Sequence, residues 1–373
     1  MDYTKPVWGE DVVNALAGKG CIVMATNIRI THSARGIMLA AKELDAAVMF
    51  EIAKSEIGYT DQPPKEFVRN IEQIAQEVEF NQPYVIHGDH IGIKENTSEA
   101  VGAGEKLIKD MLDAGFTSFA IDASHNFDVG APTVRQQLRD NIEITCKLAK
   151  LIPEQAGLEV EVGEVGKKDP KTGEKALTTV EEAKTYIQAI KDAGFNPNLI
   201  ATNNGTAHGN TYDVNGNLVE QVGIDIERTK AIADAIAPFG TYVAQHGITG
   251  TPLNMMHLLI GAGVLKGNVG TNWQNVALDS MPHDLVSRME DWTLKSPHAE
   301  KMKAKKPGIS RNELVGKNIK NAIKVFKPEI DALSGDDRAK VDEATKNSAL
   351  AFFKAFKAEG TASAVREYIE GKG

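Results

Sequence analysis

The chain has 373 residues, 42% of them hydrophobic and 25% charged, which is enough to bury a large core. Its formal net charge is −9 without a block of basic residues, so non-specific binding to nucleic acid is not expected. Two cysteines, Cys21 and Cys146, are too few for a disulfide framework or a cysteine-type zinc site. The N-terminus has no signal-peptide pattern and no apolar run has membrane-spanning length, so we expect a cytoplasmic protein without membrane contact.

Short apolar runs recur along the chain, and each is followed by a segment with helical features. Several runs are apolar over most of their length, which is typical of strands buried on both faces of a parallel sheet. Eight strands that alternate with helices predict an α/β fold, the closed (β/α)8 TIM barrel. An open doubly wound sheet is the alternative, but the segment after the first strand, ATNIRITHSARG, lacks a phosphate-binding fingerprint. The expected strands begin at Cys21, Ala46, Tyr84, Phe116, Gly157, Asn198, Thr241 and Val264.

Helix signals are clearest in two of the intervening segments. EKLIKDMLDAG has an apolar face and ends at Gly115, which can cap a helix C-terminus. TTVEEAKTYIQAIKDAG opens with Thr178 and Glu181 at the spacing of a capping box and ends at Gly194. Both segments finish with Asp-Ala-Gly-Phe and lead into a strand, as repeated βα units would.

The strand pattern stops after about residue 278. Within residues 279–373, the stretch PHAEKMKAKKPGISRNE is polar and basic, so we expect it to be an exposed excursion, and the last part of the chain has helical features. We therefore predict a single barrel domain over residues 1–373, with strands within about 20–278. The helical C-terminal extension would pack on the barrel or on a neighbour.

Polar side chains gather at the carboxyl ends of the expected strands, which meet on one face of such a barrel. Three histidines with a carboxylate between them are suitable ligands for zinc or a similar divalent ion, with a position left for substrate. Any one of them could instead bond a loop backbone, but the barrel brings all three to one face. The set is Asp89-His90 on the third strand, Glu161 and Glu164 on the fifth, His208 after the sixth, His246 after the seventh and Asn268 on the eighth.

Small-residue loops follow the last strands, with the sequences NNGTAHG, HGITG and GNVGTN. Loops at this place in a barrel often hold phosphate through backbone N–H groups, and glycine lets the backbone approach closely. Beside a metal site, these loops suggest a phosphorylated substrate. His257 in the apolar segment LNMMHLLI is interpreted as a core histidine, and His87 as a residue on the Asp89 side of its strand without a ligand role.

In chain order, HGDH, LEVEVGEVG, GTAHG, HGITG and KGNVGTN resemble the motifs of class II, metal-dependent fructose-bisphosphate aldolases, over roughly residues 10–280. MATNI and FAIDASHNFD resemble segments of the family's first and fourth strands. The resemblance implies a lyase that reversibly cleaves fructose 1,6-bisphosphate to dihydroxyacetone phosphate and glyceraldehyde 3-phosphate through an enediolate that the metal stabilises. It also implies Zn²⁺ or another divalent transition metal as cofactor, phosphorylated ketose and triose substrates, and a homo-oligomer (dimer or tetramer).

The family's site residues carry over to matching positions of this sequence. The resemblance implies Asp89 as the acid/base at the substrate C4 oxygen and Asn268 as the residue that holds the enediolate. The implied metal ligands are His90, His208 and His246, with Glu161 as a carboxylate that can also approach the metal. The implied substrate and phosphate contacts are Asn27, Gly209, Gly247, Thr249, Gly250, Gly270 and Thr271.

The fifth-strand loop departs from the family pattern of two glycines followed by acidic residues. One of those acids removes the C1 proton of dihydroxyacetone phosphate. Here the loop reads GEVGKKDPKTGEK, with Lys167 at the second glycine. Asp169 is therefore the candidate for this base, and Glu164 is the next choice.

Other departures concern substrate binding. The family's serine near the end of the second strand is Ala53 here, with Ser55 as a stand-in, and the acidic residue after the eighth-strand asparagine is Gly270. No arginine matches the one that grips the distal phosphate, although Lys317 lies nearby. Tagatose 1,6-bisphosphate or another phosphoketose therefore stays open as the substrate.

Asp89 and His90 are adjacent, so a regular strand would turn them to opposite faces. Both reach the site only if the strand has a bend or bulge there. Two further functions stay open: a Schiff-base aldolase with Lys266 as its amine, and a non-catalytic phosphosugar-binding subunit with an aldolase-like barrel.

Overall fold

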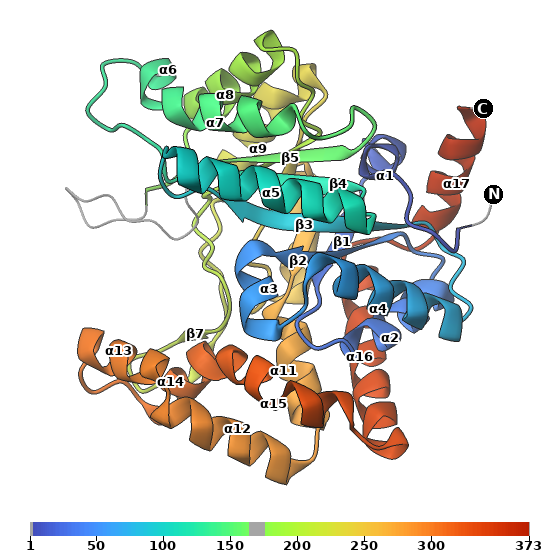
Figure 1. The fold of residues 1–373 in the computed structure, drawn as a ribbon. Coiled ribbons are helices and arrows are strands. Elements are labelled where there is room, and N and C mark those ends of the chain that lie inside the picture. The colour runs from blue at the N-terminus through green and yellow to red at the C-terminus, as the bar shows by residue number, and fades with distance from the viewer. Residues whose placement is uncertain (1–2, 164–175, 373) are drawn as a thin grey trace.

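A closed barrel of parallel strands forms the centre of the computed structural model, which describes residues 3–163 and 176–372 (Figure 1). The strands are neighbours in chain order, and the last closes the barrel by pairing with the first, as at Met24 opposite Gly267. This architecture confirms the predicted (β/α)8 barrel. Its strands are β1 (Val23–Asn27), β2 (Val48–Ala53), β3 (Tyr84–Gly92), β4 (Ser118–Asp122), β5 (Gly157–Val162), β6 (Leu199–Thr202), β9 (Tyr242–Gln245) and β10 (Val264–Val269).

Helices cover the outside of the barrel between its strands. They are α2 (Ser33–Glu43), α3 (Lys54–Thr60), α4 (Pro64–Glu77), α5 (Ser98–Ala114), α6 (Val134–Gln137), α7 (Arg139–Ala149), α8 (Val180–Asp192), α9 (Ile226–Ile236), α10 (Met256–Gly261) and α11 (Thr271–Ser280). α5 ends at Gly115, whose φ of +104° confirms its expected capping role. The capping box of α8 is formed by Thr179 and Glu182, one residue later than predicted, because the hydroxyl of Thr178 donates to the end of β5 instead.

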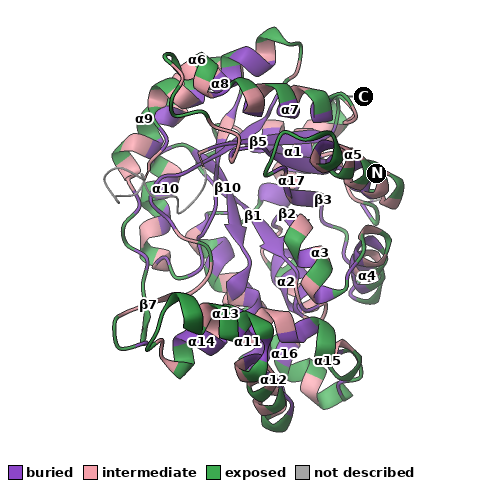
Figure 2. Ribbon diagram, turned by 60° about the vertical axis from the view of Figure 1, so that its left-hand side comes forward, coloured by how far each residue is buried: buried purple, intermediate pink, exposed green. Residues whose placement is uncertain are grey.

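The barrel interior changes from apolar to polar along its axis. At the N-terminal end of the strands, side chains such as Val23, Met49 and Leu199 form an apolar cluster. The helices α1 (Gly9–Leu16) and α17 (Thr361–Gly371) contribute to this cluster and close that end of the barrel (Figure 1). Figure 2 shows the strands as buried, yet further along the axis the buried side chains are charged. The polar functional groups therefore lie toward the carboxyl ends of the strands.

The C-terminal segment folds into helices that pack on the barrel, one of the two placements expected from the sequence. These helices are α12 (His283–Lys295), α13 (Pro297–Lys305), α14 (Arg311–Asn318), α15 (Ala322–Asp331) and α16 (Gly335–Ala355). α16 runs along α2, and Gly36 permits this approach because a Cβ there would lie 2.4 Å from the carbonyl oxygen of Asp342. The expected polar excursion is largely the exposed helix α13.

Short elements complete the described part of the chain. The loop after β6 carries a hairpin of β7 (Thr211–Tyr212) and β8 (Leu218–Val219), which reaches toward α14. Single 3-10 turns are η1 (Ala237–Phe239), η2 (Leu253–Met255) and η3 (Ile319–Asn321). Within residues 3–163 and 176–372, no helix combines the length and apolarity that crossing a membrane requires.

Candidate active site

A cavity of about 330 Å³ opens at the carboxyl end of the barrel. It collects side chains from the ends of most strands, and all but two of the site residues predicted from the sequence line it. Gly250 is exposed and does not line the cavity, and its carbonyl accepts from the backbone N–H of Gln221. Asp169 lies outside the described residues, as do its neighbours Glu164 and Lys167. The fold thus brings the rest of the predicted set to one place.

The three predicted histidine ligands converge in this cavity. His90 comes from β3, His208 from the loop after β6, and His246 directly follows β9. One ring nitrogen of each lies within 4.8 Å of one of the others, and His90 Nε2 is 2.8 Å from His246 Nδ1. His246 is buried, His90 is half-buried and His208 is exposed at the cavity mouth, so the cluster is open to solvent and substrate on one side.

Carboxylates behind two of these rings determine which nitrogens face each other. His246 Nε2 lies 2.7 Å from Glu159 Oε1, so Nε2 donates and Nδ1 is left as an acceptor. His90 Nδ1 lies 3.0 Å from a Glu161 oxygen and 3.4 Å from Asp122, so Nδ1 donates and Nε2 is the acceptor. Two lone pairs at 2.8 Å repel each other unless a cation lies between them. The donor set therefore fits a divalent metal ion.

The negative charge around His90 also favours a cation at this point of the cavity. Burial disfavours a charged imidazole, but the carboxylates of Asp89 and Glu161 outweigh burial and raise the pKa of His90 well above its usual value. Positive charge is therefore favourable at this point of the cavity, whether a proton or a metal ion provides it.

Strand β3 is irregular where it supplies two of the site residues. Its pairing with β4 shifts register between Gly88 and Ile91, and His90 has φ +41°, a region that few non-glycine residues adopt. The shift turns both Asp89 and His90 into the cavity, which confirms the bend expected from the sequence. Such a strained residue costs on the order of 1–3 kcal/mol and is typical of functional sites.

Asp89 is contacted by amides from β1 and β10 and is held as a carboxylate by nearby cationic groups. Asn27 Nδ2 donates to one oxygen at 2.9 Å, and Asn268 Nδ2 lies 3.4 Å from the other. Burial opposes ionisation, but nearby cationic groups, His90 foremost, outweigh it and hold the pKa of Asp89 below its usual value. Asn268 Oδ1 is buried without a hydrogen-bond partner among the described residues, so it is available to a ligand donor in the cavity.

Backbone at the cavity rim has features of an anion site. Gly209 and Gly247 have φ of +77° and +70°, and a Cβ on Gly247 would lie 2.7 Å from the carbonyl oxygen of Ala207. α11 begins at Thr271 directly after Gly270, and both residues line the same cavity. Helix N-termini and glycine-rich turns both favour phosphate.

Two cations line the mouth near α3. Arg29 Nε donates to Glu56 at 2.7 Å and Arg29 Nη1 to the hydroxyl of Thr271 at 3.0 Å. Lys320 lies 5.4 Å from the ring centroid of Tyr59 and makes no ion pair with a carboxylate in the described part of the chain. Lys320 is therefore a cation available to a ligand.

The sequence placed Lys317 near this region without assigning it to the distal phosphate. Lys317 Nζ forms an ion pair with Glu313 at 2.9 Å and does not line the cavity, while Lys320 does. Ala53 and Ser55 both line the cavity, as the departure at the second strand suggested. His257 is exposed rather than in the core, because α10 turns this side chain to solvent.

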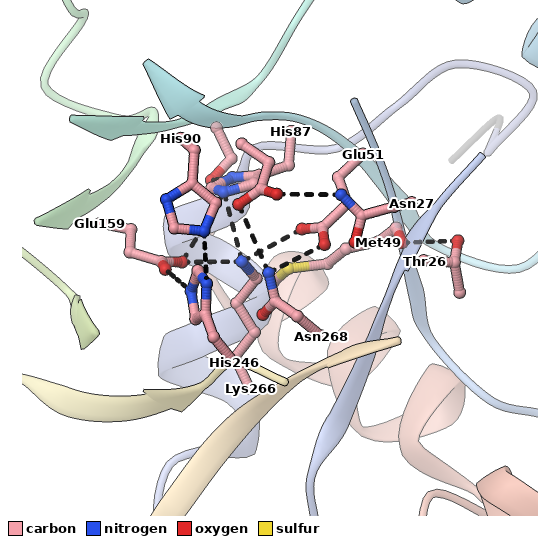
Figure 3. Close-up of polar contacts among 12 residues, drawn as sticks. Thr26, Asn27, Met49, Glu51, His87, His90, Glu159, His246, Lys266 and Asn268 are labelled. Carbon is pink, nitrogen blue, oxygen red and sulfur yellow. Dashed lines mark hydrogen bonds and ion pairs between the residues drawn. The ribbon is translucent and has the colours of Figure 1, made fainter. Parts of the chain in front are cut away.

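Several polar residues lie beneath the cavity, of which the sequence analysis passed over Glu51 and Glu159 and did not connect His87 or Lys266 with them. They are Glu51, His87, Glu159 and Lys266, each at most 1% exposed (Figure 3). Three of them precede a predicted site residue by two positions on its strand, where the side chain returns to the same face. This alternation of side chains along a strand could have indicated those three residues. Lys266 was considered only as a Schiff-base amine. Burial lowers the pKa of Lys266, but Glu159 and Glu51 outweigh burial and raise that pKa. Lys266 is therefore held as an ammonium rather than as a nucleophilic amine.

Comparisons with known proteins agree with this geometry. The family model described as fructose-bisphosphate aldolase class-II matches residues 9–333. A fructose-bisphosphate aldolase from Streptococcus pneumoniae is 26% identical over 275 residues, which cover 72% of this chain and 80% of that protein. The crystal structure of the YdjI aldolase from Escherichia coli K12 has a TM-score of 0.60 at 18% identity and covers 95% of this chain and 98% of its own. The crystal structure of a fructose-bisphosphate aldolase from Campylobacter jejuni has a TM-score of 0.59 at 17% identity and covers 96% of this chain and 97% of its own.

Proposed function

This chain belongs to the class II fructose-bisphosphate aldolase family, whose members are metal-dependent lyases, and we propose that it reversibly cleaves fructose 1,6-bisphosphate. The products would be dihydroxyacetone phosphate and glyceraldehyde 3-phosphate. One observation carries the proposal: three imidazoles with ring nitrogens within 4.8 Å of one another share a cavity with an ionised aspartate.

We propose Zn²⁺ as the ion and His90, His208 and His246 as its ligands, because neutral imidazole nitrogen suits zinc. Glu161 can approach the same ion, since it already contacts His90. A bound ion supplies Lewis-acid chemistry by polarising the ketose carbonyl. The protein's part is to hold the rings in one tautomer, which Glu159 and Glu161 do from behind.

Asp89 is the proposed acid/base. In the cleavage direction its carboxylate accepts the proton of the C4 hydroxyl while the bond between C3 and C4 breaks, and the three-carbon aldehyde forms. The bonding electron pair stays with the other three-carbon half. Asn27 and Asn268 keep the carboxylate aimed, and Asn268 Oδ1 can accept from a hydroxyl of that half.

A second group must return a proton to the three-carbon half at the carbon that becomes C1 of dihydroxyacetone phosphate. Asp169 is our candidate and Glu164 the next choice, although both lie outside the described residues. The described residues on either side of them lie at the carboxyl end of the barrel: Gly163 directly follows β5, and the carbonyl of Ala176 accepts from Asn203, just after β6.

Phosphate binding gives the substrate its orientation. Gly209, Gly247 and the start of α11 at Thr271 support a site for the phosphate next to the ketose carbonyl. Lys320, assisted by Arg29, is the proposed contact for the distal phosphate. This pair replaces the family arginine for which the sequence offered no match.

A cleavage assay tests the proposal. Fructose 1,6-bisphosphate, tagatose 1,6-bisphosphate and fructose 1-phosphate would be supplied separately to the metal-loaded protein, and triose release measured. We expect the highest kcat/KM with fructose 1,6-bisphosphate. Faster cleavage of tagatose 1,6-bisphosphate would reassign the substrate, and no cleavage of any ketose by protein with bound metal would favour the non-catalytic alternative.

A further inference from the structure

Lys266 on β10 lies inside the barrel beneath the cavity and is 0% exposed. Its ammonium has three acceptors within reach: Glu159 Oε2 at 2.8 Å, Glu51 Oε2 at 3.1 Å and His87 Nε2 at 3.3 Å (Figure 3). An ammonium has three N–H donors, which matches the number of groups around it. Its position is therefore fixed from three strands, β5, β2 and β3, none of which pairs with β10.

One arm of this network leads to a proposed metal ligand. Lys266 occupies Glu159 Oε2, which leaves Glu159 Oε1 to accept from His246 Nε2 at 2.7 Å. That hydrogen bond assigns the proton of His246 to Nε2 and leaves Nδ1 as the lone pair toward His90. The lysine thereby acts on the ligand tautomer through one carboxylate.

The other arm leads to the proposed substrate contact. Lys266 also forms an ion pair with Glu51 Oε2 at 3.1 Å, an oxygen that has no hydrogen bond among the described residues, while Glu51 Oε1 accepts from Asn268 Nδ2 at 2.9 Å. This contact turns the amide so that Asn268 Oδ1, the oxygen without a partner among the described residues, is the atom presented to a ligand. The same lysine thus orients an acceptor at the reacting centre.

We propose that Lys266 is a positioning residue that fixes the His246 tautomer through Glu159 and the Asn268 amide through Glu51. The role in catalysis rests on the proposed function, but the role in metal binding does not. A cluster that only stabilised the barrel would need opposite charges. It would not need Glu159 Oε1 and Glu51 Oε1 to be the oxygens that accept from His246 and Asn268.

Carboxylate-to-amide variants test each arm, because an amide has only one acceptor oxygen. In Glu159→Gln, the amide oxygen accepts from the ammonium of Lys266, and the amide NH₂ group then faces His246 Nε2. The proton of His246 must move to Nδ1, so we expect metal affinity to fall about 10- to 100-fold, the usual effect of losing a partner behind a ligand. In Glu51→Gln, the same conflict flips Asn268, so we expect kcat to fall about 10-fold with metal affinity unchanged.

Removal of the lysine provides the decisive comparison. With Lys266→Met added to the Glu51→Gln/Glu159→Gln variant, the cluster is uncharged, and each amide is free to turn its oxygen toward His246 or Asn268. We expect this triple variant to bind metal about 10-fold or more tightly than the double variant that keeps Lys266. Metal affinity is measured by competition with a chromophoric chelator, and the Co²⁺ absorption spectrum reports the coordination geometry.

A purely structural cluster predicts instead that Glu51→Gln and Glu159→Gln weaken metal binding alike, because each removes one negative charge beside Lys266. Equal or weaker metal affinity in the triple variant would overturn the proposal, as would a Glu51→Gln variant that loses metal as completely as Glu159→Gln. Thermal unfolding of each variant identifies any that are not folded, and the single carboxylate-to-amide variants still test the two arms. Absence of cleavage in the unmodified protein would refute the proposed function but leave the metal comparison intact.

Discussion

Replacing Lys320 by methionine should weaken binding of a substrate that carries a distal phosphate. Lys320 lines the cavity, is half-buried and has no carboxylate partner among the described residues, so its charge is available to a ligand. A charge pair at about 4 Å gains roughly 4 kcal/mol at an effective dielectric constant of about 20. After desolvation, a charged hydrogen bond contributes about 1.5–3 kcal/mol. We therefore expect kcat/KM for fructose 1,6-bisphosphate to fall about 10- to 150-fold.

The assay compares two substrates and two lysines. Fructose 1-phosphate lacks the distal phosphate, so Lys320→Met should leave its kcat/KM nearly unchanged. Lys317→Met is the matched control, because Lys317 is three residues earlier but forms an ion pair with Glu313 outside the cavity. Equal losses with both substrates, or an equal loss in Lys317→Met, would refute the assignment of Lys320 to the distal phosphate.

The other predictions concern the acid/base groups and the packing of the C-terminal extension. His246→Ala should lose bound metal and activity together, whereas Asp89→Asn should retain metal and lose cleavage by about 10²–10⁴-fold; metal loss in Asp89→Asn equal to that in His246→Ala would contradict this separation of roles. Asp169→Ala should slow solvent exchange of the C1 proton of dihydroxyacetone phosphate, measured by NMR, while Glu164→Ala should matter less; the reverse order would move the base to Glu164. Gly36→Ala should lower the free energy of unfolding by about 1–3 kcal/mol, because its Cβ would lie 2.4 Å from the carbonyl of Asp342 on α16. Gly102→Ala in α5, with no atom within 4 Å of the added Cβ, is the control and should stabilise by up to about 1 kcal/mol.

The barrel and its catalytic face could be predicted because their signals are local in sequence. Buried parallel strands are continuous apolar runs, and the residues at their carboxyl ends meet whatever the loop lengths are. Even the irregularity of β3 followed from the sequence, since Asp89 and His90 cannot both enter the cavity from a regular strand.

The partners of these residues could not be predicted, because they come from elsewhere in the chain. Lys266 contacts Glu51 across the barrel, a pairing that depends on strand tilt and side-chain length. Lys320 reaches the cavity from the C-terminal helices, whose packing on the barrel no periodicity specifies. The interpretation of His257 as a core histidine was wrong for a related reason. An apolar helix still exposes one face, and its rotation is set by tertiary contacts.

The central claim is that cleavage requires a metal held by the three histidines. It is tested most directly by measuring retro-aldol cleavage of fructose 1,6-bisphosphate in one preparation as purified, after chelation, and after return of stoichiometric Zn²⁺. We predict activity, loss of activity and recovery, with the return of one metal ion per cavity. Undiminished cleavage in verified metal-free protein, particularly if borohydride then trapped substrate on a lysine, would contradict the account.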